Sequence, residues 1–298
     1  MLPSTVIRVR NLAKSYGPFQ AVKGIDLDVG AGKVFALLGP NGAGKTTTVE
    51  ILEGYRSRTA GQVSVLGTDP ESAPPSFRQK IGIVLQSTGV EPYLTVAELI
   101  EQFRGYYSDP RPLDEIIEVV ALGPKRDERV KRLSGGQQRR LDVALGLAGN
   151  PQLLFLDEPT TGFDPGARRG AWDMISNLRE LGVTVFLTTH YMDEAQSLAD
   201  EVAILVDGRI AAQGPPSVLT TDKRSRVRFR VPQGAVPPLP VSKVGTGELA
   251  EIYTDEPTRD LHALTSWAVN EGLELDALTV SRGSLEDVYL ELTRQEQS

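Results

Sequence analysis

The sequence predicts an α/β fold: a mostly parallel sheet covered by helices, with a helical subdomain inserted into it and a small α+β domain after it. Three observations carry this prediction. Short apolar runs such as VFALL and LLFLD alternate with helical patterns as far as about Leu219. Between Gln86 and about Val130, two amphipathic helical segments follow each other without a buried strand. After Leu219 an alternating strand and a Pro/Gly-rich loop begin a different pattern.

We therefore expect one domain over residues 1–220, with the helical subdomain at about 87–132, and an accessory domain over residues 221–298. Segments that read as strands in the first domain are KVFALLG, RQKIGIVLQ, PQLLFLD, GVTVFLTTH and DEVAILVDG. Segments that read as helices are TVEILEGY, TVAELIEQFRGYY, LDEIIEVVALG, LDVALGLAG, GARRGAWDMISNLREL and YMDEAQSLA.

The accessory domain begins with RVRFRV, whose alternation places Val227, Phe229 and Val231 on one face. Strand-like ELAEIYT, helical RDLHALTSWAVNEG and strand-like LELDALTV follow. The last helix, SLEDVYLELT, has Ser284 and Asp287 in capping-box positions.

Composition limits the classes of protein. The chain has 298 residues, 40% of them hydrophobic, and a net charge of −7, which argues against nucleic acid as the main partner. Without cysteine it forms no disulfide and no thiolate zinc site. No apolar run approaches the roughly 18 residues of a membrane span, so membrane association would need a partner. The basic run KRSRVRFR, from Lys223, could meet anionic lipid headgroups, although such a run is more often the solvated side of an edge strand.

The stretch GPNGAGKTT, Gly39–Thr47, lies between a predicted strand and a predicted helix. It fits G-x-x-x-x-G-K-[ST], the phosphate-binding loop, in which glycines let backbone N–H groups converge on an anion at a helix start. Lys45 can reach the outer phosphates, and the Thr46 hydroxyl can coordinate Mg²⁺. The alternative is a chance glycine-rich turn. The predicted nucleotide-binding residues here are Gly39, Pro40, Asn41, Gly42, Ala43, Gly44, Lys45, Thr46 and Thr47.

A nucleotide site also needs a carboxylate for Mg²⁺ and a group that handles water. The run LLFLDEP places Asp157 at the end of a buried strand, where it can hold Mg²⁺, usually through a water. Glu158 follows and can polarise the attacking water. The alternative is a strand that ends in two solvated acids.

The segment LSGGQ begins at Leu133 and suggests a second anion site, since Ser134 can cap the following helix. A plain helix start would look the same. The order of motifs, however, resembles the ATP-binding subunit of an ABC transporter over about Val6 to Leu219, and LSGGQ is that family's signature. In that family two subunits pair head to tail, and each signature helix caps the γ-phosphate bound by the other subunit. The residues that the resemblance assigns to this second site are Ser134, Gly135, Gly136 and Gln137.

The resemblance implies further roles. Tyr16 corresponds to the aromatic residue that stacks on adenine, and Gln86 to the glutamine that touches Mg²⁺ and the water. Asp164 corresponds to the aspartate that crosses the dimer interface, with Phe163 before it where the family usually has leucine. His190 corresponds to the histidine that contacts the γ-phosphate. No motif is degenerate, so the catalytic set of Lys45, Gln86, Glu158 and His190 predicts an active ATPase using ATP and Mg²⁺.

One nucleotide site per chain and no spanning segment imply a second ATP-binding subunit, expected to be another copy, and separate permease subunits in the membrane. The chain would then lie on the cytoplasmic face of the cell membrane as a peripheral subunit. The ending SLEDVYLELT, together with the segment LTTHYMDEAQSLADEVAILVDGRI, resembles subunits of bacterial drug-resistance exporters of the daunorubicin-resistance type. The alternatives are an ABC importer ATPase, a soluble ABC ATPase that does not transport, and a kinase or GTPase sharing only the phosphate loop.

Overall fold

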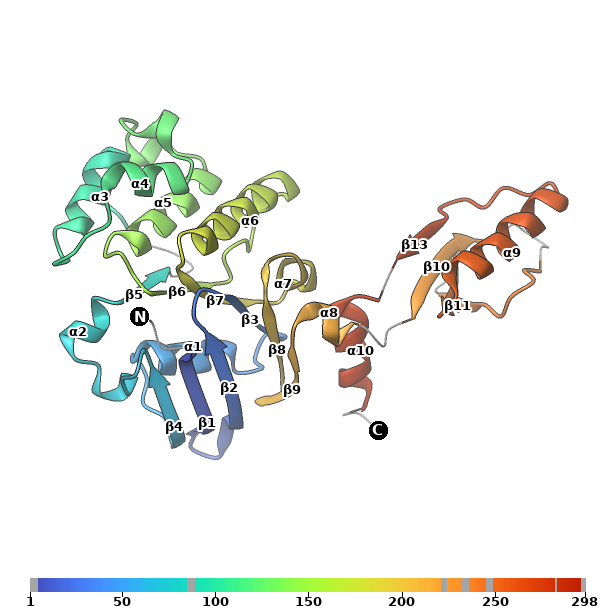
Figure 1. Ribbon diagram of the computed structural model, residues 1–298, viewed down its shortest axis with the longest axis horizontal. Helices are drawn as coiled ribbons and strands as arrows, with labels where there is room; N and C mark the ends of the chain where they lie inside the picture. Colours follow the sequence, from blue (N-terminus) through green and yellow to red (C-terminus); the bar gives the residue numbers. More distant parts are fainter. Residues whose placement is uncertain are drawn as a thin grey trace. The chain divides into compact units, whose positions relative to one another are not determined.

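The computed structural model describes residues 5–84, 89–220, 224–231, 236–244, 249–281 and 283–295. The chain divides into two compact units, Met1–Pro216 and Ser217–Ser298 (Figure 1). The first unit contains two sheets and the second unit one, and each unit has its own hydrophobic cluster.

A six-stranded sheet forms the centre of the first unit, in the order β5-β6-β7-β3-β8-β9. Its strands are β3 (Val34–Leu38), β5 (Ile81–Val84), β6 (Leu153–Asp157), β7 (Thr184–Thr189), β8 (Glu201–Val206) and β9 (Arg209–Gly214). All neighbours pair in parallel except β8 and β9, which are antiparallel. Every residue of β3 and β7 is buried, as expected for strands covered on both faces. The predicted parallel sheet is thus confirmed.

A second sheet in this unit is antiparallel and has the order β2-β1-β4. It comprises β1 (Thr5–Tyr16), β2 (Phe19–Gly30) and β4 (Ala60–Val65). The sequence patterns did not separate these strands from the parallel sheet. The hairpin places Tyr16 at the end of β1, next to its partner Phe19, so one aromatic lies on each side of a tight turn.

Helices cover the six-stranded sheet (Figure 1). Helix α1 (Lys45–Glu53) contacts β2, β4 and β6, and therefore lies between the two sheets. Helices α5 (Gly135–Leu147), α6 (Pro165–Glu180) and α7 (Met192–Leu198) contact β5, β7 and β3.

One predicted strand is shorter than expected. The segment RQKIGIVLQ forms β5 only from Ile81, because Arg78 ends a short helix, α2 (Pro75–Arg78). Pro75 at the first helical position favours that helix, since its fixed φ suits a helix start. The end of the segment, with the predicted site residue Gln86, lies outside the described residues.

Three phenylalanines on neighbouring strands fix the face of the sheet that meets α1. The ring centroids of Phe35 and Phe186 are 5.3 Å apart, and those of Phe155 and Phe186 are 5.7 Å apart. All three belong to the cluster that includes Ile51 of α1. Side chains alternate along a strand, so Asp157, two residues after Phe155, projects on the α1 side.

The helical subdomain contains α3 (Val96–Arg104) and α4 (Leu113–Val119), as predicted, together with short 3₁₀ turns at Gly123–Lys125 and Val130–Arg132. Thr95 and Glu98 cap α3 with reciprocal hydrogen bonds. The described part of this region, residues 89–132, has no strand.

The second unit begins within a short helix, α8 (Pro216–Leu219), and contains an antiparallel sheet of order β11-β12-β10-β13. Its elements are β10 (Ser225–Arg230), β11 (Ser242–Val244), β12 (Leu249–Thr254), α9 (Pro257–Asn270), β13 (Thr279–Ser281) and α10 (Leu285–Gln295).

The core of this unit confirms the predicted face of the first strand. Val227 and Phe229 are fully buried against Leu264 of α9, and Val231 packs at the edge of the same cluster. The prediction of a strand over LELDALTV was wrong for its first residues. A turn with Ala277 at φ +55° interrupts the segment before β13.

Polar contacts of the second unit bear on two predictions. Ser284 and Asp287 form the predicted capping box, with backbone-to-side-chain hydrogen bonds of 2.9 and 3.3 Å. Arg228 Nε donates to Glu251 at 2.8 Å, and Arg226 lies 3.6 Å from Asp287. These pairs favour a solvated strand over a lipid-binding surface for the basic run; Lys223 itself lies outside the described residues.

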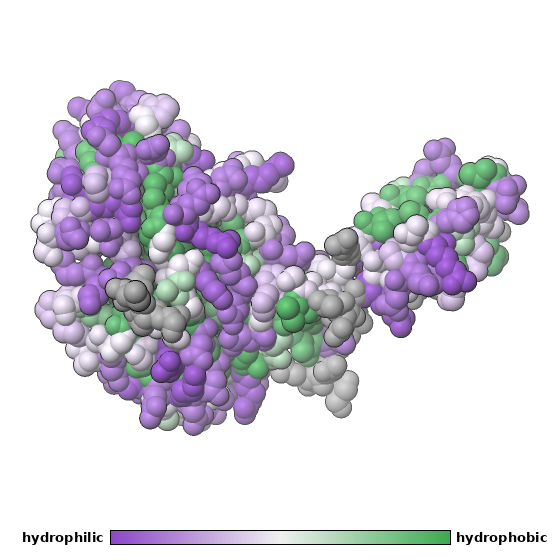
Figure 2. Space-filling view, in the orientation of Figure 1, coloured by the Kyte–Doolittle hydropathy of each residue, from purple (hydrophilic) through white to green (hydrophobic). Residues whose placement is uncertain are grey.

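In the parts of the chain that the structure describes, no helix is both long enough and apolar enough to span a bilayer. Figure 2 shows a mostly hydrophilic face with small, scattered apolar areas.

Candidate active site

The phosphate loop, Gly39–Thr47, connects the end of β3 to the start of α1. Two of its glycines are required by close backbone contacts. A Cβ at Gly39 would lie 2.4 Å from the Leu205 carbonyl oxygen. Gly44 has φ +105°, and a Cβ there would lie 2.6 Å from the Ala21 carbonyl oxygen. The loop is thereby held at the amino end of α1, where backbone N–H groups and the helix dipole favour an anion.

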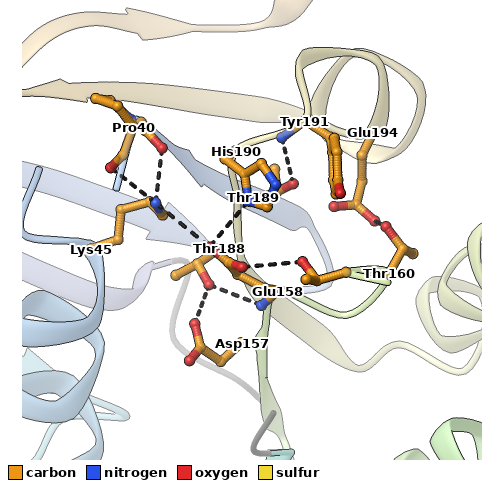
Figure 3. Close-up of polar contacts among 12 residues, drawn as sticks. Pro40, Lys45, Asp157, Glu158, Thr160, Thr188, Thr189, His190, Tyr191 and Glu194 are labelled. Atoms are coloured by element: carbon orange, nitrogen blue, oxygen red, sulfur yellow. Dashed lines mark hydrogen bonds and ion pairs between the residues drawn. The ribbon is translucent and has the colours of Figure 1, made fainter. Parts of the chain in front are cut away.

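Lys45 projects from the first turn of α1 into the centre of the site (Figure 3). Its Nζ donates to the carbonyl oxygens of Gly39 at 2.8 Å and Pro40 at 3.2 Å, and lies 3.7 Å from Glu158 Oε1. Burial lowers the pKa of Lys45, and the nearby charges of Glu158 and Asp157 partly offset this effect.

Glu158 lies between Lys45 and His190 (Figure 3). Its Oε1 is 3.2 Å from His190 Nδ1, and its Oε2 accepts a hydrogen bond from Thr161 Oγ1 at 3.1 Å. Its φ of +44° is in the left-handed region, which costs a non-glycine residue about 1–2 kcal/mol. Burial raises the pKa of Glu158, but His190, Thr161 and Lys45 together lower it more, so the net shift is below the ordinary value. The carboxylate is therefore ionised at neutral pH.

Thr188 orients both acids at the end of β6. Its hydroxyl donates to Asp157 Oδ1 and accepts a hydrogen bond from the Glu158 backbone N at 3.1 Å. Thr188 is fully buried. The sequence analysis missed this residue; the signal was a hydroxyl inside the apolar run VFLTT.

A cleft of about 420 Å³ runs along the phosphate loop, within the roughly 300–1,000 Å³ typical of small-molecule sites. Tyr16 lines it and is 40% exposed. Phe19 and Arg56, which the sequence analysis missed, line it too. The Arg56 guanidinium lies 5.4 Å from the centre of the Tyr16 ring and pairs with Glu50. The Tyr16 ring therefore makes a cation–π contact with Arg56, whose side chain is oriented by Glu50.

The signature residues do not line this cleft. Ser134 and Gln137 cap α5 reciprocally, with hydrogen bonds of 3.0 and 3.4 Å. They share a hollow with Phe163, and the adjacent Asp164 caps α6 by accepting from the backbone of Gly166 at 2.8 Å. Within one chain the predicted residues thus form two groups, one around the phosphate loop and one at the amino ends of α5 and α6. A second hollow, of about 730 Å³, is lined by a residue of each group, Glu158 and Gly135.

Arg139 connects these two groups and was also missed from the sequence. It is 7% exposed. Its guanidinium donates to the carbonyl oxygens of Asp157 at 2.9 Å and Pro159 at 3.3 Å. These carbonyls flank Glu158, so α5 is tied to the backbone that carries this residue.

The chain is similar to known proteins along nearly its whole length. Residues 22–161 match the family described as ABC transporter, and residues 225–284 match the family described as ABC transporter domain-containing protein-like, C-terminal domain. The chain is 36% identical to the daunorubicin/doxorubicin resistance ATP-binding protein DrrA of Streptomyces peucetius, with 98% of this chain and 93% of that protein covered. The chain belongs to the ABC transporter ATP-binding proteins.

Other ABC proteins agree. Nod factor export ATP-binding protein I of Ralstonia nicotianae is 35% identical, with 98% of this chain and 94% of that protein covered. CbiO1 of Clostridium perfringens, part of an ABC transporter complex, has a TM-score of 0.67 at 26% identity, covering 74% of this chain and 92% of that chain. A dimeric ATP-binding cassette in a post-hydrolysis state, bound to ADP and phosphate, has a TM-score of 0.61 at 26% identity, covering 70% and 98%.

These comparisons confirm the predicted α/β fold and the resemblance to ABC transporter subunits. As an ABC ATPase, the chain binds and hydrolyses ATP. The similarity to exporter subunits supports the exporter interpretation. The alternative of a kinase or GTPase that shares only the phosphate loop is wrong.

Glu53 gives this ABC ATPase a predicted pH dependence. It is 7% exposed, and burial, with smaller effects from Asp157 and Glu50, raises its pKa from 4.5 to about 8. Between pH 4.5 and about pH 8, the Glu53 carboxyl therefore stays protonated in the folded chain and is ionised in the unfolded chain. The stability from this proton is complete below pH 4.5 and is lost as the pH rises through about 8.

We expect the free energy of unfolding to fall between pH 5 and pH 8.5 more steeply in the native chain than in Glu53→Gln, by on the order of 3 kcal/mol. Urea unfolding at pH 5.5, 7.0 and 8.5 measures the difference. Equal pH slopes in the two proteins would contradict the assignment.

Proposed function

We propose that this ATPase energises the efflux of a drug-like or other hydrophobic compound through a separate permease at the cytoplasmic face of the cell membrane. The observation that carries the proposal is the similarity to an antibiotic-resistance ATP-binding protein across both units. An importer ATPase or a soluble ABC ATPase would share the first unit's motifs. The similarity of the second unit favours the exporter over both.

The geometry of the site supports a separate role for each of four residues. Lys45, already desolvated and surrounded by oxygen atoms, would exchange these partners for the outer phosphates of ATP. Glu158 would accept a proton from the attacking water, since its carboxylate is ionised and close to Lys45. His190, in contact with Glu158, would donate to the γ-phosphate. Tyr16 would stack on the adenine at the exposed end of the cleft.

Magnesium fits the oxygen atoms present. Mg²⁺ binds one or two carboxylates together with substrate phosphates. The Asp157 carboxylate faces the α1 side of the sheet, and Thr46 lies in the first turn of that helix. Thr46 and Asp157, with Gln86, would hold the ion, which would neutralise charge on the phosphates. Thr188 would keep Asp157 oriented by its hydrogen bond.

A second copy of the chain would complete the site. Ser134 and Gly135 are exposed at the amino end of α5, where a helix start favours an anion. They do not line the cleft along the phosphate loop of their own chain, although Gly135 shares a second hollow with Glu158. In a head-to-tail dimer they would meet the γ-phosphate bound by the partner, and Asp164 would lie at the interface. ATP would thereby hold the two copies together until hydrolysis.

The permease would dock on the helical subdomain. Tyr93 and Tyr106 there are 65% and 66% exposed. Amphipathic aromatics of this kind are enriched at interfaces. Phe103 and Tyr107 are partly buried, so they contribute to the subdomain's own packing as well.

The proposed function is tested by affinity purification of the tagged chain from gently solubilised native membranes, followed by mass spectrometry. We expect a polytopic membrane protein in stoichiometric amount. Recovery only from the soluble fraction, with ribosomal or chromosomal proteins, would refute the exporter assignment. Uptake of the recovered complex's cargo in sealed inside-out vesicles would then separate export from import.

A further inference from the structure

Glu194 is a fully buried carboxylate beside the active site that the proposed mechanism leaves without a role. It lies in the first turn of α7. Its Oε1 accepts hydrogen bonds from Thr160 Oγ1 at 2.8 Å and from Trp172 Nε1 at 3.3 Å. The Thr189 side chain is a third polar neighbour, which lowers the pKa of Glu194. These three neighbours come from three separate segments: the loop after β6, helix α6 and the end of β7.

Two of these segments carry predicted site residues. We define the interface loop as Thr160–Asp164. One residue, Pro159, separates it from Glu158. Thr189 directly precedes His190. Figure 3 shows Glu194 beside Thr160 on one side and the turn that carries His190 on the other. One carboxylate therefore joins the loop that leads to Asp164 with the strand end that positions the histidine.

A stack of three side chains, Arg168, Tyr191 and His190, makes a second connection from α6 to the histidine. The Arg168 guanidinium lies 4.2 Å from the centre of the Tyr191 ring, whose centre is 4.0 Å from that of the His190 ring. The backbone N of Tyr191 donates to Thr189 Oγ1 at 3.0 Å. Because Asp164 caps the same helix, a shift of α6 would reach His190 through this stack as well.

Burial makes a carboxylate costly at this position. Burial raises the pKa of Glu194, and hydrogen bonds from Thr189, Thr160 and Trp172 only partly offset the effect. An apolar side chain would fill the same space without this cost. The acceptor oxygens are thus the feature that distinguishes Glu194 from a packing residue.

We propose that Glu194 is a positioning residue that couples the interface loop to His190, so that closure of the two-subunit interface and placement of the histidine occur together. The inference rests on the proposed function, because it assumes that Glu158 and His190 act on ATP. Since Glu194 does not line the nucleotide cleft, its loss slows turnover without weakening ATP binding.

The test uses the full chain and measures kcat, KM and the Kd of a fluorescent ATP analogue. Glu194→Ala and Thr160→Val each lower kcat by about tenfold, the effect expected when a buried hydrogen bond of this kind is removed. Both leave Kd within about twofold. The double variant loses no more than Glu194→Ala alone, because both changes break one connection. Glu194→Gln keeps an acceptor for Thr160 and retains most of the activity.

The matched control is Trp172→Phe, which removes a donor to Glu194 from α6 and leaves the interface loop connected. It keeps kcat near that of the native chain. Unchanged kcat in both Thr160→Val and Glu194→Ala overturns the inference. Equal losses of kcat in Thr160→Val and Trp172→Phe also overturn it. A rise in Kd that accompanies the loss of kcat overturns it too, because either result would show a general destabilisation of the site.

Glu158→Gln, measured beside these variants, distinguishes a failure of the proposed function from a failure of the Glu194 coupling. If Glu158→Gln retains turnover, the proposed function fails. If Glu158→Gln loses turnover while Glu194→Ala and Thr160→Val retain it, only the coupling inference fails. Should Glu194→Ala not fold, Thr160→Val, which keeps the side-chain shape, decides the result.

Discussion

Replacing Glu158 by glutamine is expected to lower kcat for ATP hydrolysis by about 10²–10³-fold, the usual loss when a general base is removed. Glutamine keeps the size of the side chain and can still accept from Thr161, but it cannot take the proton of the attacking water. The native carboxylate is ionised at neutral pH, because its contacts with His190, Thr161 and Lys45 outweigh the effect of burial. Binding of ATP should remain or tighten, because Glu158→Gln removes one negative charge beside the phosphates.

The measurement is phosphate release at saturating ATP, together with the Kd of a fluorescent ATP analogue. Glu180→Gln is the matched control, since Glu180 is exposed at the far end of α6. Turnover in Glu158→Gln close to that of the control would show that another group activates the water.

Lys45→Ala is expected to weaken ATP binding by about 10- to 100-fold. A hydrogen bond between charged groups contributes about 1.5–3 kcal/mol, and each 1.4 kcal/mol is about tenfold in Kd. Lys45 is 6% exposed, so its burial has already been compensated by the carbonyl oxygens of Gly39 and Pro40 and by Glu158. Without the lysine, the phosphates would face Glu158 with no cation of α1 between them.

Isothermal titration with ATP measures this effect, and Lys33→Ala, an exposed lysine just before β3, is the control. The circular dichroism spectrum confirms that the variant is folded. Equal affinity in the two variants would remove Lys45 from the phosphate site and with it the assignment of the loop.

The sequence was sufficient for the parts of this molecule that rest on local pattern. The phosphate loop predicts its own geometry, because the positive φ and close contacts of Gly44 leave no room for a side chain. Buried parallel strands are nearly continuous in apolar residues, so β3, β6 and β7 were recognisable. Asp157 could be placed at the end of a strand because it directly follows an apolar run, whereas the role of His190 came from the resemblance to ABC transporter subunits.

Residues that act through tertiary contacts could not be predicted. Thr188 and Glu194 look like ordinary polar residues until β7 and α7 are placed against the loop after β6. Arg139 is one of several arginines in its segment, and only the packing of α5 selects it for the carbonyls around Glu158. The sequence pattern did not single out Phe19, because its place in the cleft depends on how the β1–β2 hairpin meets the phosphate loop.

We propose that the ATP site of one copy is completed by the signature segment of another. Light scattering coupled to size-exclusion chromatography of Glu158→Gln, with and without ATP and Mg²⁺, tests it most directly. We expect a monomer without nucleotide and a dimer with one ATP per chain. We also expect Ser134→Arg to stay monomeric while still binding ATP. A monomer that binds ATP under all conditions, or a dimer that forms equally well without ATP, would contradict it.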